Sequence, residues 1–107
     1  MRAYELMIIF SADLDESTVQ ASINRISGQA EEAGGKVEKV DKWGVRRFAY
    51  EINHKWEGFY VVLEIASPNA LDEVDRTLRL ADDVVRHKFI RLPVPEAHKR
   101  GLAAVTA

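Results

Sequence analysis

The order in which the spacing of apolar residues changes along the chain is the strongest constraint on its fold. Two segments, within residues 11–34 and 69–83, repeat apolar residues at steps of three and four, as an amphipathic helix does. Four other segments are rich in apolar and β-branched residues with strand-like alternation. These are residues 2–10, 36–52, 59–65 and 84–92. The sequence therefore predicts the element order β-α-β-β-α-β.

The strand segments have distinct faces, because side chains alternate along a strand. In the first, one face holds Tyr4, Leu6, Ile8 and Phe10, which we expect in the core. Its other face holds Ala3, Glu5, Met7 and Ile9, and is unusually apolar for a surface exposed to water. Gly44 predicts a bulge in the long second strand. The turn predicted at Asn53–Glu57, closed by Gly58, pairs the second and third strands as a hairpin.

Both helical segments have recognisable ends. Asp13 and Glu16 form a capping-box pattern at the start of the first helix, and Gly34 with Gly35 ends it. Its apolar stripe is Val19, Ile23, Ile26, Ala30 and Ala33. We expect the second helix to begin at Ser67 and Pro68, since proline suits the first helical position. Its stripe is Leu71, Val74, Leu78 and Ala81.

This order predicts an α+β, ferredoxin-like split β-α-β fold, with a four-stranded antiparallel sheet and two helices on one face. The other face of the sheet is left open, and so must be polar or covered by a partner. At 107 residues the chain fits one domain, which we assign to residues 1–92. Because Pro93 and Pro95 break a strand ladder, residues 93–107 are expected to form a flexible C-terminal tail.

Composition excludes several classes of function. The chain has no cysteine, which rules out disulfides and thiolate chemistry. The apolar run Leu6–Phe10 is too short for a signal peptide or a membrane span, so a cytoplasmic location is expected. His54, His87 and His98 lie in separate segments without a nearby nucleophile or a metal-ligand pattern. We therefore expect that the protein is not an enzyme, and that it has no catalytic residues, no bound metal and no cofactor.

Charge is separated along the chain although the formal net charge is only −2. The two helical segments with their flanks carry ten acidic and three basic residues, and the remainder carries seven and twelve. Charges act mainly within a Debye length of about 8–10 Å, so a local basic face can bind RNA. Scatter of charges over a solvated surface is the alternative interpretation.

Arginine and lysine suit phosphates, and aromatic rings suit exposed bases. The RNA-binding candidates are Arg2, Tyr4, Trp43, Arg46, Arg47, Arg86, His87, Lys88 and Arg91. The first and last strands are expected to be neighbours, so Arg2 would join Arg86–Arg91 in one patch. Trp43 is explained equally well by packing at the bulge. An RNA-recognition motif is disfavoured for two reasons. Phe59 shares a face with the core residues, and Glu57 occupies a position where that motif has a basic residue.

Four stretches of the chain resemble one known family. They are Arg2–Glu5, Trp43–Ile52, the strand opening Gly58–Tyr60 and Leu78–Arg86, and the Gly44-x-Arg-Arg-x-Ala-Tyr50 block is the most specific. In order and spacing they resemble the bacterial small-subunit (30S) ribosomal protein S6 family over about residues 1–92. That family has the fold predicted above.

The resemblance implies a non-catalytic constituent of the small ribosomal subunit that binds 16S rRNA in its central domain together with ribosomal protein S18. By position, Arg2, Tyr4, Arg46, Arg47 and Arg86 would be contacts, whereas His87, Lys88 and Arg91 follow from local charge. The apolar open face would receive the protein partner through Met7, Ile9, Tyr60 and Val62. Two alternatives share the fold: a dimeric ligand-binding or regulatory module, and a small dimeric enzyme.

Overall fold

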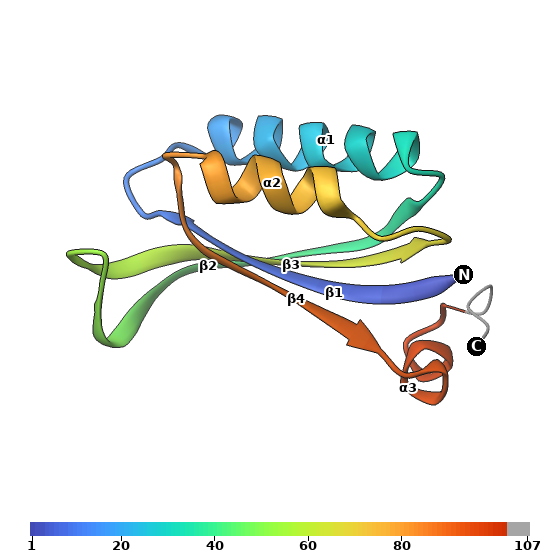
Figure 1. Cartoon of the computed structure of the whole chain (residues 1–107). Coiled ribbons are helices and arrows are strands. Elements are labelled where there is room, and N and C mark those ends of the chain that lie inside the picture. Colours follow the sequence, from blue (N-terminus) through green and yellow to red (C-terminus); the bar gives the residue numbers. More distant parts are fainter. Residues whose placement is uncertain (103–107) are drawn as a thin grey trace.

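The computed structural model describes residues 1–102 and has the predicted order of strands and helices (Figure 1). The elements are β1 (Arg2–Ser11), α1 (Glu16–Glu32), β2 (Lys36–Ile52), β3 (Lys55–Ser67), α2 (Asp72–Leu80), β4 (Val84–Leu92) and α3 (Val94–Lys99). The strands form one antiparallel sheet in the order β2-β3-β1-β4, and α1 and α2 lie together over one of its faces. The predicted split β-α-β fold is confirmed.

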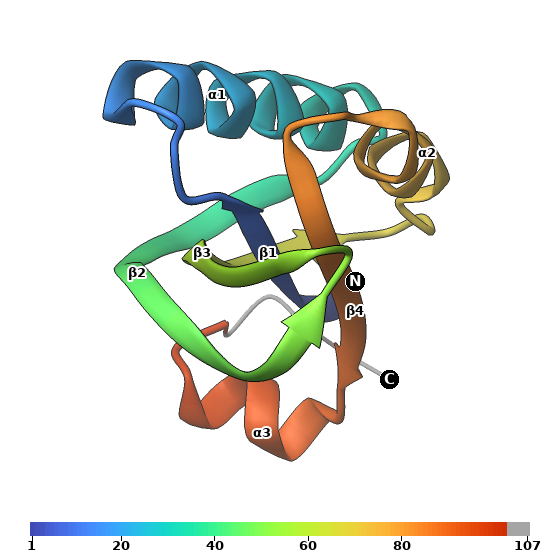
Figure 2. The same cartoon turned by 90° about the vertical axis from the view of Figure 1, so that its left-hand side faces the viewer.

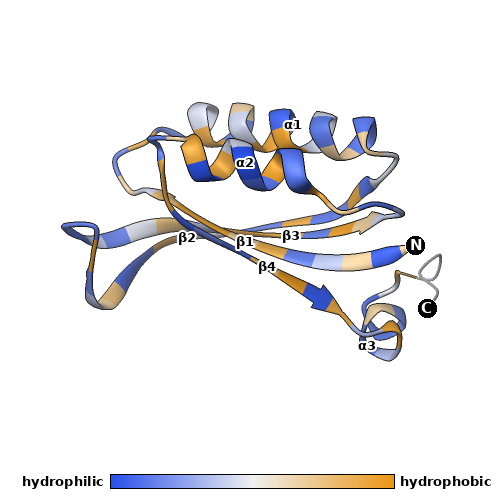
Figure 3. Ribbon diagram, in the orientation of Figure 1, coloured by the Kyte–Doolittle hydropathy of each residue, from blue (hydrophilic) through white to orange (hydrophobic). Residues whose placement is uncertain are grey.

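The main core lies between the sheet and these two helices. β1 and β3 contribute Leu6, Ile8, Phe10, Val61, Leu63 and Ile65, all fully buried. The stripe of α1 supplies Val19, Ile23 and Ile26 from above, and α2 supplies Val74 and Leu78. Hydrophilic and hydrophobic residues alternate around both helices in Figure 3, as expected for helices with one buried face. No helix within residues 1–102 is long and apolar enough to cross a membrane.

Both helices begin later than the sequence predicts. The N-cap of α1 is Asp15, not Asp13: its Oδ1 accepts a hydrogen bond from the Thr18 backbone N–H at 2.8 Å. Hydrogen bonds from Thr18 and then Ser17 lower the pKa of Asp15 below its usual value. α2 begins at Asp72, because Ser67 ends β3 and its hydroxyl donates to the Asn69 carbonyl at 2.8 Å.

The hairpin formed by β2 and β3 is longer and tighter than predicted. β3 begins at Lys55, and only Asn53 and His54 form the turn, both with positive φ (48° and 63°). The predicted bulge is confirmed by a register shift between Lys42 and Gly44, where Gly44 has a φ of 85°. The far end of the hairpin curls across the sheet in Figure 2, and Asn53 Nδ2 donates to the Val85 carbonyl at 3.0 Å.

Helix α3 covers one end of the sheet face opposite α1 and α2 (Figure 1). Ala97 and Leu102 are buried against Ala3, Ala66 and Leu92. The expected tail thus begins with a helix, and the face predicted to be open is covered at this end. Residues 103–107 of the expected tail lie outside the described residues, and the flexibility of residues 93–107 stays a prediction.

Candidate nucleic-acid interface

The register of β1 with β4 decides on which side of the sheet each basic residue lies. Residues directly opposite one another in antiparallel strands point to the same face. Arg86 is opposite Ile9 and Lys88 is opposite Met7, so these two cations lie on the face away from α1 and α2. We call this surface, between the hairpin and α3, the open face.

His87 and Arg91 lie on the other side of the sheet, because they are opposite Ile8 and Tyr4. The expectation that Arg2 and Arg86–Arg91 form one patch is therefore wrong. β1 and β4 are neighbours as predicted, but alternation along β4 divides its cations between two faces.

Two of the helix-side candidates are held by internal contacts. His87 Nε2 is 2.7 Å from Asp75 Oδ1 on α2, with 15% of the His87 side chain exposed. The Tyr4 ring packs edge-on against Phe89, and the Tyr4 hydroxyl accepts a hydrogen bond from Arg2 at 3.5 Å. Tyr4 thus keeps its predicted place against the core, and its role as an RNA contact stays a prediction. Arg2 and Arg91 are exposed.

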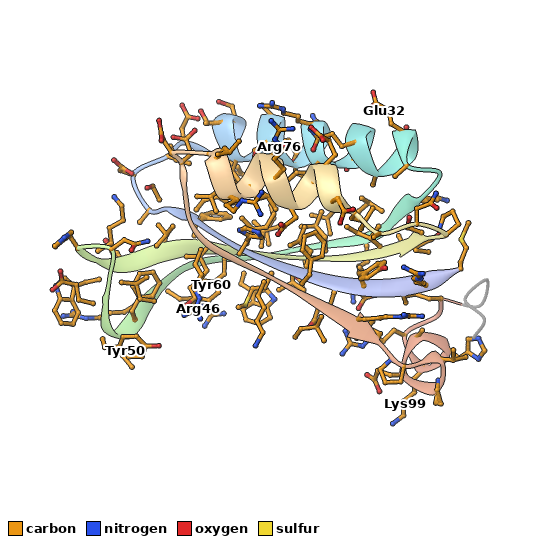
Figure 4. All side chains as sticks on the ribbon, viewed as in Figure 1. Glu32, Arg46, Tyr50, Tyr60, Arg76 and Lys99 are labelled. Atoms are coloured by element: carbon orange, nitrogen blue, oxygen red, sulfur yellow. The ribbon has the colours of Figure 1, made fainter. Side chains whose placement is uncertain are left out.

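On the open face, the basic side chains surround an apolar centre. Arg46, Arg86 and Lys88 are exposed there. Arg47 is exposed as well, but it is opposite Glu57 and alternates with Arg46, so its side chain starts from the other side of the hairpin. None of the four forms an ion pair with another residue in the range 1–102. In Figure 4, Arg46 and Tyr60 extend from the sheet on the side opposite Arg76 and Glu32, which lie in the helix layer.

The apolar centre is smaller than the sequence predicts. Met7, Tyr60 and Val62 are half-buried and reach the surface, but Ile9 is only 3% exposed. Phe48, from the curled hairpin, packs on Ile9 and removes it from the surface. A groove of about 290 Å³ remains between the hairpin and the sheet. It is lined on the sheet side by Met7, Arg86 and Lys88, and on the hairpin side by Arg47 and Tyr50.

Trp43 lies at the bulge and packs there, as one of its two predicted roles requires; its RNA contact stays a prediction. Its ring is parallel to that of Tyr60, with 6.1 Å between centroids and 5° between planes. Its indole N–H donates to Asp41 at 3.2 Å. With 46% of the residue exposed, Trp43 packs at the bulge and still presents a ring to solvent beside Arg46. This arrangement can stack on a base and contact a phosphate.

Two exposed aromatic residues of the hairpin were missed by the sequence reasoning. Tyr50 is 63% exposed and Trp56 is 52% exposed. The sequence did contain a signal for these two residues. Each large ring lies close in sequence to a basic residue, Arg47 or Lys55, near the predicted turn, which is unusual for a solvated surface. Trp56 falls within the predicted turn Asn53–Glu57, so the strand pattern does not single it out. In the described part of the chain, no group of three or more histidine or acidic residues could hold a metal ion.

Comparison with protein families identifies the chain's relatives. The family model described as ribosomal protein S6 matches residues 3–91. The small ribosomal subunit protein bS6 of Carboxydothermus hydrogenoformans is 48% identical over 92 residues, which cover 85% of this chain and 96% of that protein. The bS6 protein of Salinispora tropica is 49% identical over the same length and shares of both chains.

A solved structure shows the same architecture. The 30S ribosomal protein S6 of Thermotoga maritima superposes with a TM-score of 0.81 at 30% identity, over 95% of this chain and 97% of that one. The P2 domain of a chemotaxis kinase from the same organism has a TM-score of 0.54 at 17% identity, over 85% of this chain and 98% of that one. Its likeness concerns the fold alone.

Proposed function

This chain belongs to the ribosomal protein S6 family, and from that premise we propose that it binds 16S rRNA in the central domain of the small ribosomal subunit, together with ribosomal protein S18. As a family member it is a small-subunit ribosomal protein of the cytoplasm and is not an enzyme. Its contribution is to neutralise phosphates and to fix the geometry of the RNA.

The observation that carries the proposal is the set of unpaired cations on the open face. Arg46, Arg86 and Lys88 are exposed and have no acidic partner within residues 1–102. An arginine engaged by an internal carboxylate would be unavailable to a phosphate, whereas a free guanidinium can bind a phosphate through two parallel hydrogen bonds. Arg47 on the hairpin and Arg2 on the helix side are further exposed cations outside this set.

For the protein partner we propose the apolar centre formed by Met7, Tyr60 and Val62. Protein interfaces combine a dry apolar centre with a polar rim, and Arg86 and Lys88 supply that rim here. Ile9 belongs to the proposed partner face only indirectly, because it supports Phe48 from below. With S18 on the apolar centre, Arg86 and Lys88 lie at the edge of that contact, where they can also reach RNA.

The experiment is a charge reversal on the open face. We expect the double substitution Arg46→Glu and Arg86→Glu to weaken binding to an S18–central-domain RNA complex at least tenfold, or about 1.4 kcal/mol. The cause is the loss of two phosphate contacts and the repulsion introduced by two carboxylates. A filter-binding titration with purified components measures the change.

Arg76→Glu is the matched control. Arg76 is exposed on α2, in the layer opposite Arg46 (Figure 4), so its reversal changes the net charge without touching the open face. We expect affinity within about twofold of the unmodified protein. Equal losses for control and double variant would show an effect of net charge alone, and an unchanged double variant would remove these residues from the interface.

A further inference from the structure

A second concave surface lies on the other side of the hairpin, outside the open face. It is an open depression of about 590 Å³ between the loop that follows β1 and the strands next to the hairpin turn. Its lining is Ala12, Asp13, Arg47, Lys55, Trp56 and Glu57. The volume lies within the roughly 300–1,000 Å³ typical of pockets for small molecules.

The polar groups at this depression have no partners of their own. Within the described chain, the Trp56 indole N–H donates to no acceptor and its ring stacks on no other ring. Arg47 and Lys55 likewise form no ion pair or side-chain hydrogen bond with residues 1–102. Trp56, Arg47 and Lys55 therefore border one hollow, and the ring and charged groups of these residues have no partner within the described chain.

Resting on the proposed function, we propose that this depression binds one unpaired nucleotide of the rRNA, stacked on Trp56, as an RNA contact separate from the open face. The Arg47 and Lys55 side chains contact the phosphates on either side of the nucleotide. Asp13 and Glu57 supply carboxylate oxygens that accept hydrogen bonds from base amino groups. Stacking on the indole makes the larger contribution.

Hydrogen-bonding chemistry and location favour RNA as the occupant. The charges of the depression balance, but Arg47 and Lys55 can contact phosphates while Asp13 and Glu57 can accept from base amino groups, a combination that suits a nucleotide better than an apolar peptide. The hairpin also extends past the β1–α1 loop in Figure 1, so its end is accessible to a large ligand. Arg47 lines both the depression and the open-face groove, which makes the two surfaces continuous for one RNA strand.

The test compares three single variants in the S18–central-domain RNA binding assay. We expect Trp56→Ala to weaken binding about tenfold, which lies within the range for loss of one base–aromatic stack. Trp56→Phe keeps a ring and should remain within about threefold of the unmodified protein. Leu80→Ala removes a large side chain that is 68% exposed on α2, and should change nothing. Circular dichroism checks whether each variant is folded.

A second readout identifies the occupant. Fluorotryptophan labelling gives one fluorine resonance for each of the two tryptophans, and Trp56→Phe assigns the signal of Trp56. We expect this signal to shift when the RNA is added to the protein–S18 pair, and not when S18 is added alone. A shift with S18 alone would make the depression a protein contact and overturn the proposal.

The results distinguish a failure of this proposal from a failure of the proposed function. If Trp56→Ala binds as tightly as the unmodified protein while the Arg46 and Arg86 reversal weakens binding, the depression is not an RNA site and the open-face proposal stands. If neither changes affinity, both are wrong.

Discussion

Gly58 lies on β3 opposite Ser11 of β1, where Phe48 of the hairpin packs on Ile9. A Cβ atom there would overlap Ile9 Cγ2, and would lie 3.0 Å from Phe48 Cζ and 3.1 Å from the Phe10 carbonyl oxygen. The missing side chain lets the hairpin curl over the sheet and bury Phe48 on Ile9. The shape of the open face therefore depends on a single glycine.

We predict that Gly58→Ala lowers the free energy of unfolding by about 1–3 kcal/mol, because the added methyl group overpacks this contact. Gly28→Ala is the control: no atom lies within 4 Å of a Cβ at Gly28, which is exposed inside α1. That change should raise the free energy of unfolding by about 0.5–1 kcal/mol, since alanine favours helix. Urea denaturation measures both, and a neutral Gly58→Ala would disprove the close packing.

Helix α3 is tied to the sheet by the side chain of Arg100, the residue at its C-cap. Arg100 Nη1 lies 2.9 Å from Glu5 Oε1 and 3.6 Å from Glu64 Oε1, and its Nε lies 2.9 Å from Glu96 Oε1. The hydrogen bonds to Glu5 and then Glu96 raise the pKa of Arg100 above its usual value. Glu5 and Glu64 are directly opposite one another across β1 and β3, so Arg100 also neutralises two like charges.

We predict that Arg100→Met destabilises the protein by about 1–2 kcal/mol, because charged hydrogen bonds are lost and Glu5 then repels Glu64. Amide hydrogen exchange should speed up first in α3. Adding Glu5→Gln to Arg100→Met should recover part of the loss, because the repulsion is removed. Unchanged hydrogen exchange in α3 of the Arg100→Met variant would show that apolar contacts alone hold this helix on the sheet. Rapid exchange in α3 of the unmodified protein would support the predicted flexible tail.

On the scale of the whole molecule, the fold places acidic and basic surfaces in different layers. α1 and α2 expose Glu16, Glu31, Glu32, Asp72 and Glu73, while the opposite face exposes Arg46, Arg86 and Lys88. Although the formal net charge is only −2, the helix side of the molecule therefore carries a negative surface and the opposite side a positive one. Such a molecule approaches a polyanion with one side.

We predict that RNA affinity falls steeply as salt rises, since each phosphate contact releases counterions. In a plot of log affinity against log salt concentration, the double variant Arg46→Glu, Arg86→Glu should have a slope shallower by roughly one to two units, and Arg76→Glu an unchanged slope. Equilibrium titrations over a series of salt concentrations measure these slopes. A slope that is equal in all three proteins would contradict an electrostatic role for the open face.

The sequence determined the local features, because they depend on residues close together in the chain. The alternation of Leu6, Ile8 and Phe10, the stripe of α1 and the bulge at Gly44 each follow from a short-range rule, and together they fixed the element order and the fold class. The cations Arg46, Arg47 and Arg86 were also correctly expected at the surface.

Only the tertiary structure decided which of the candidates lie together. The register of β1 with β4 placed His87 against Asp75 and Arg86 on the opposite face, and a register between distant strands cannot be read from either strand alone. The curl of the hairpin buried Ile9, and the docking of α3 covered Ala3. These outcomes depend on contacts between residues far apart in the chain, whose free energy arises only when the whole fold has formed.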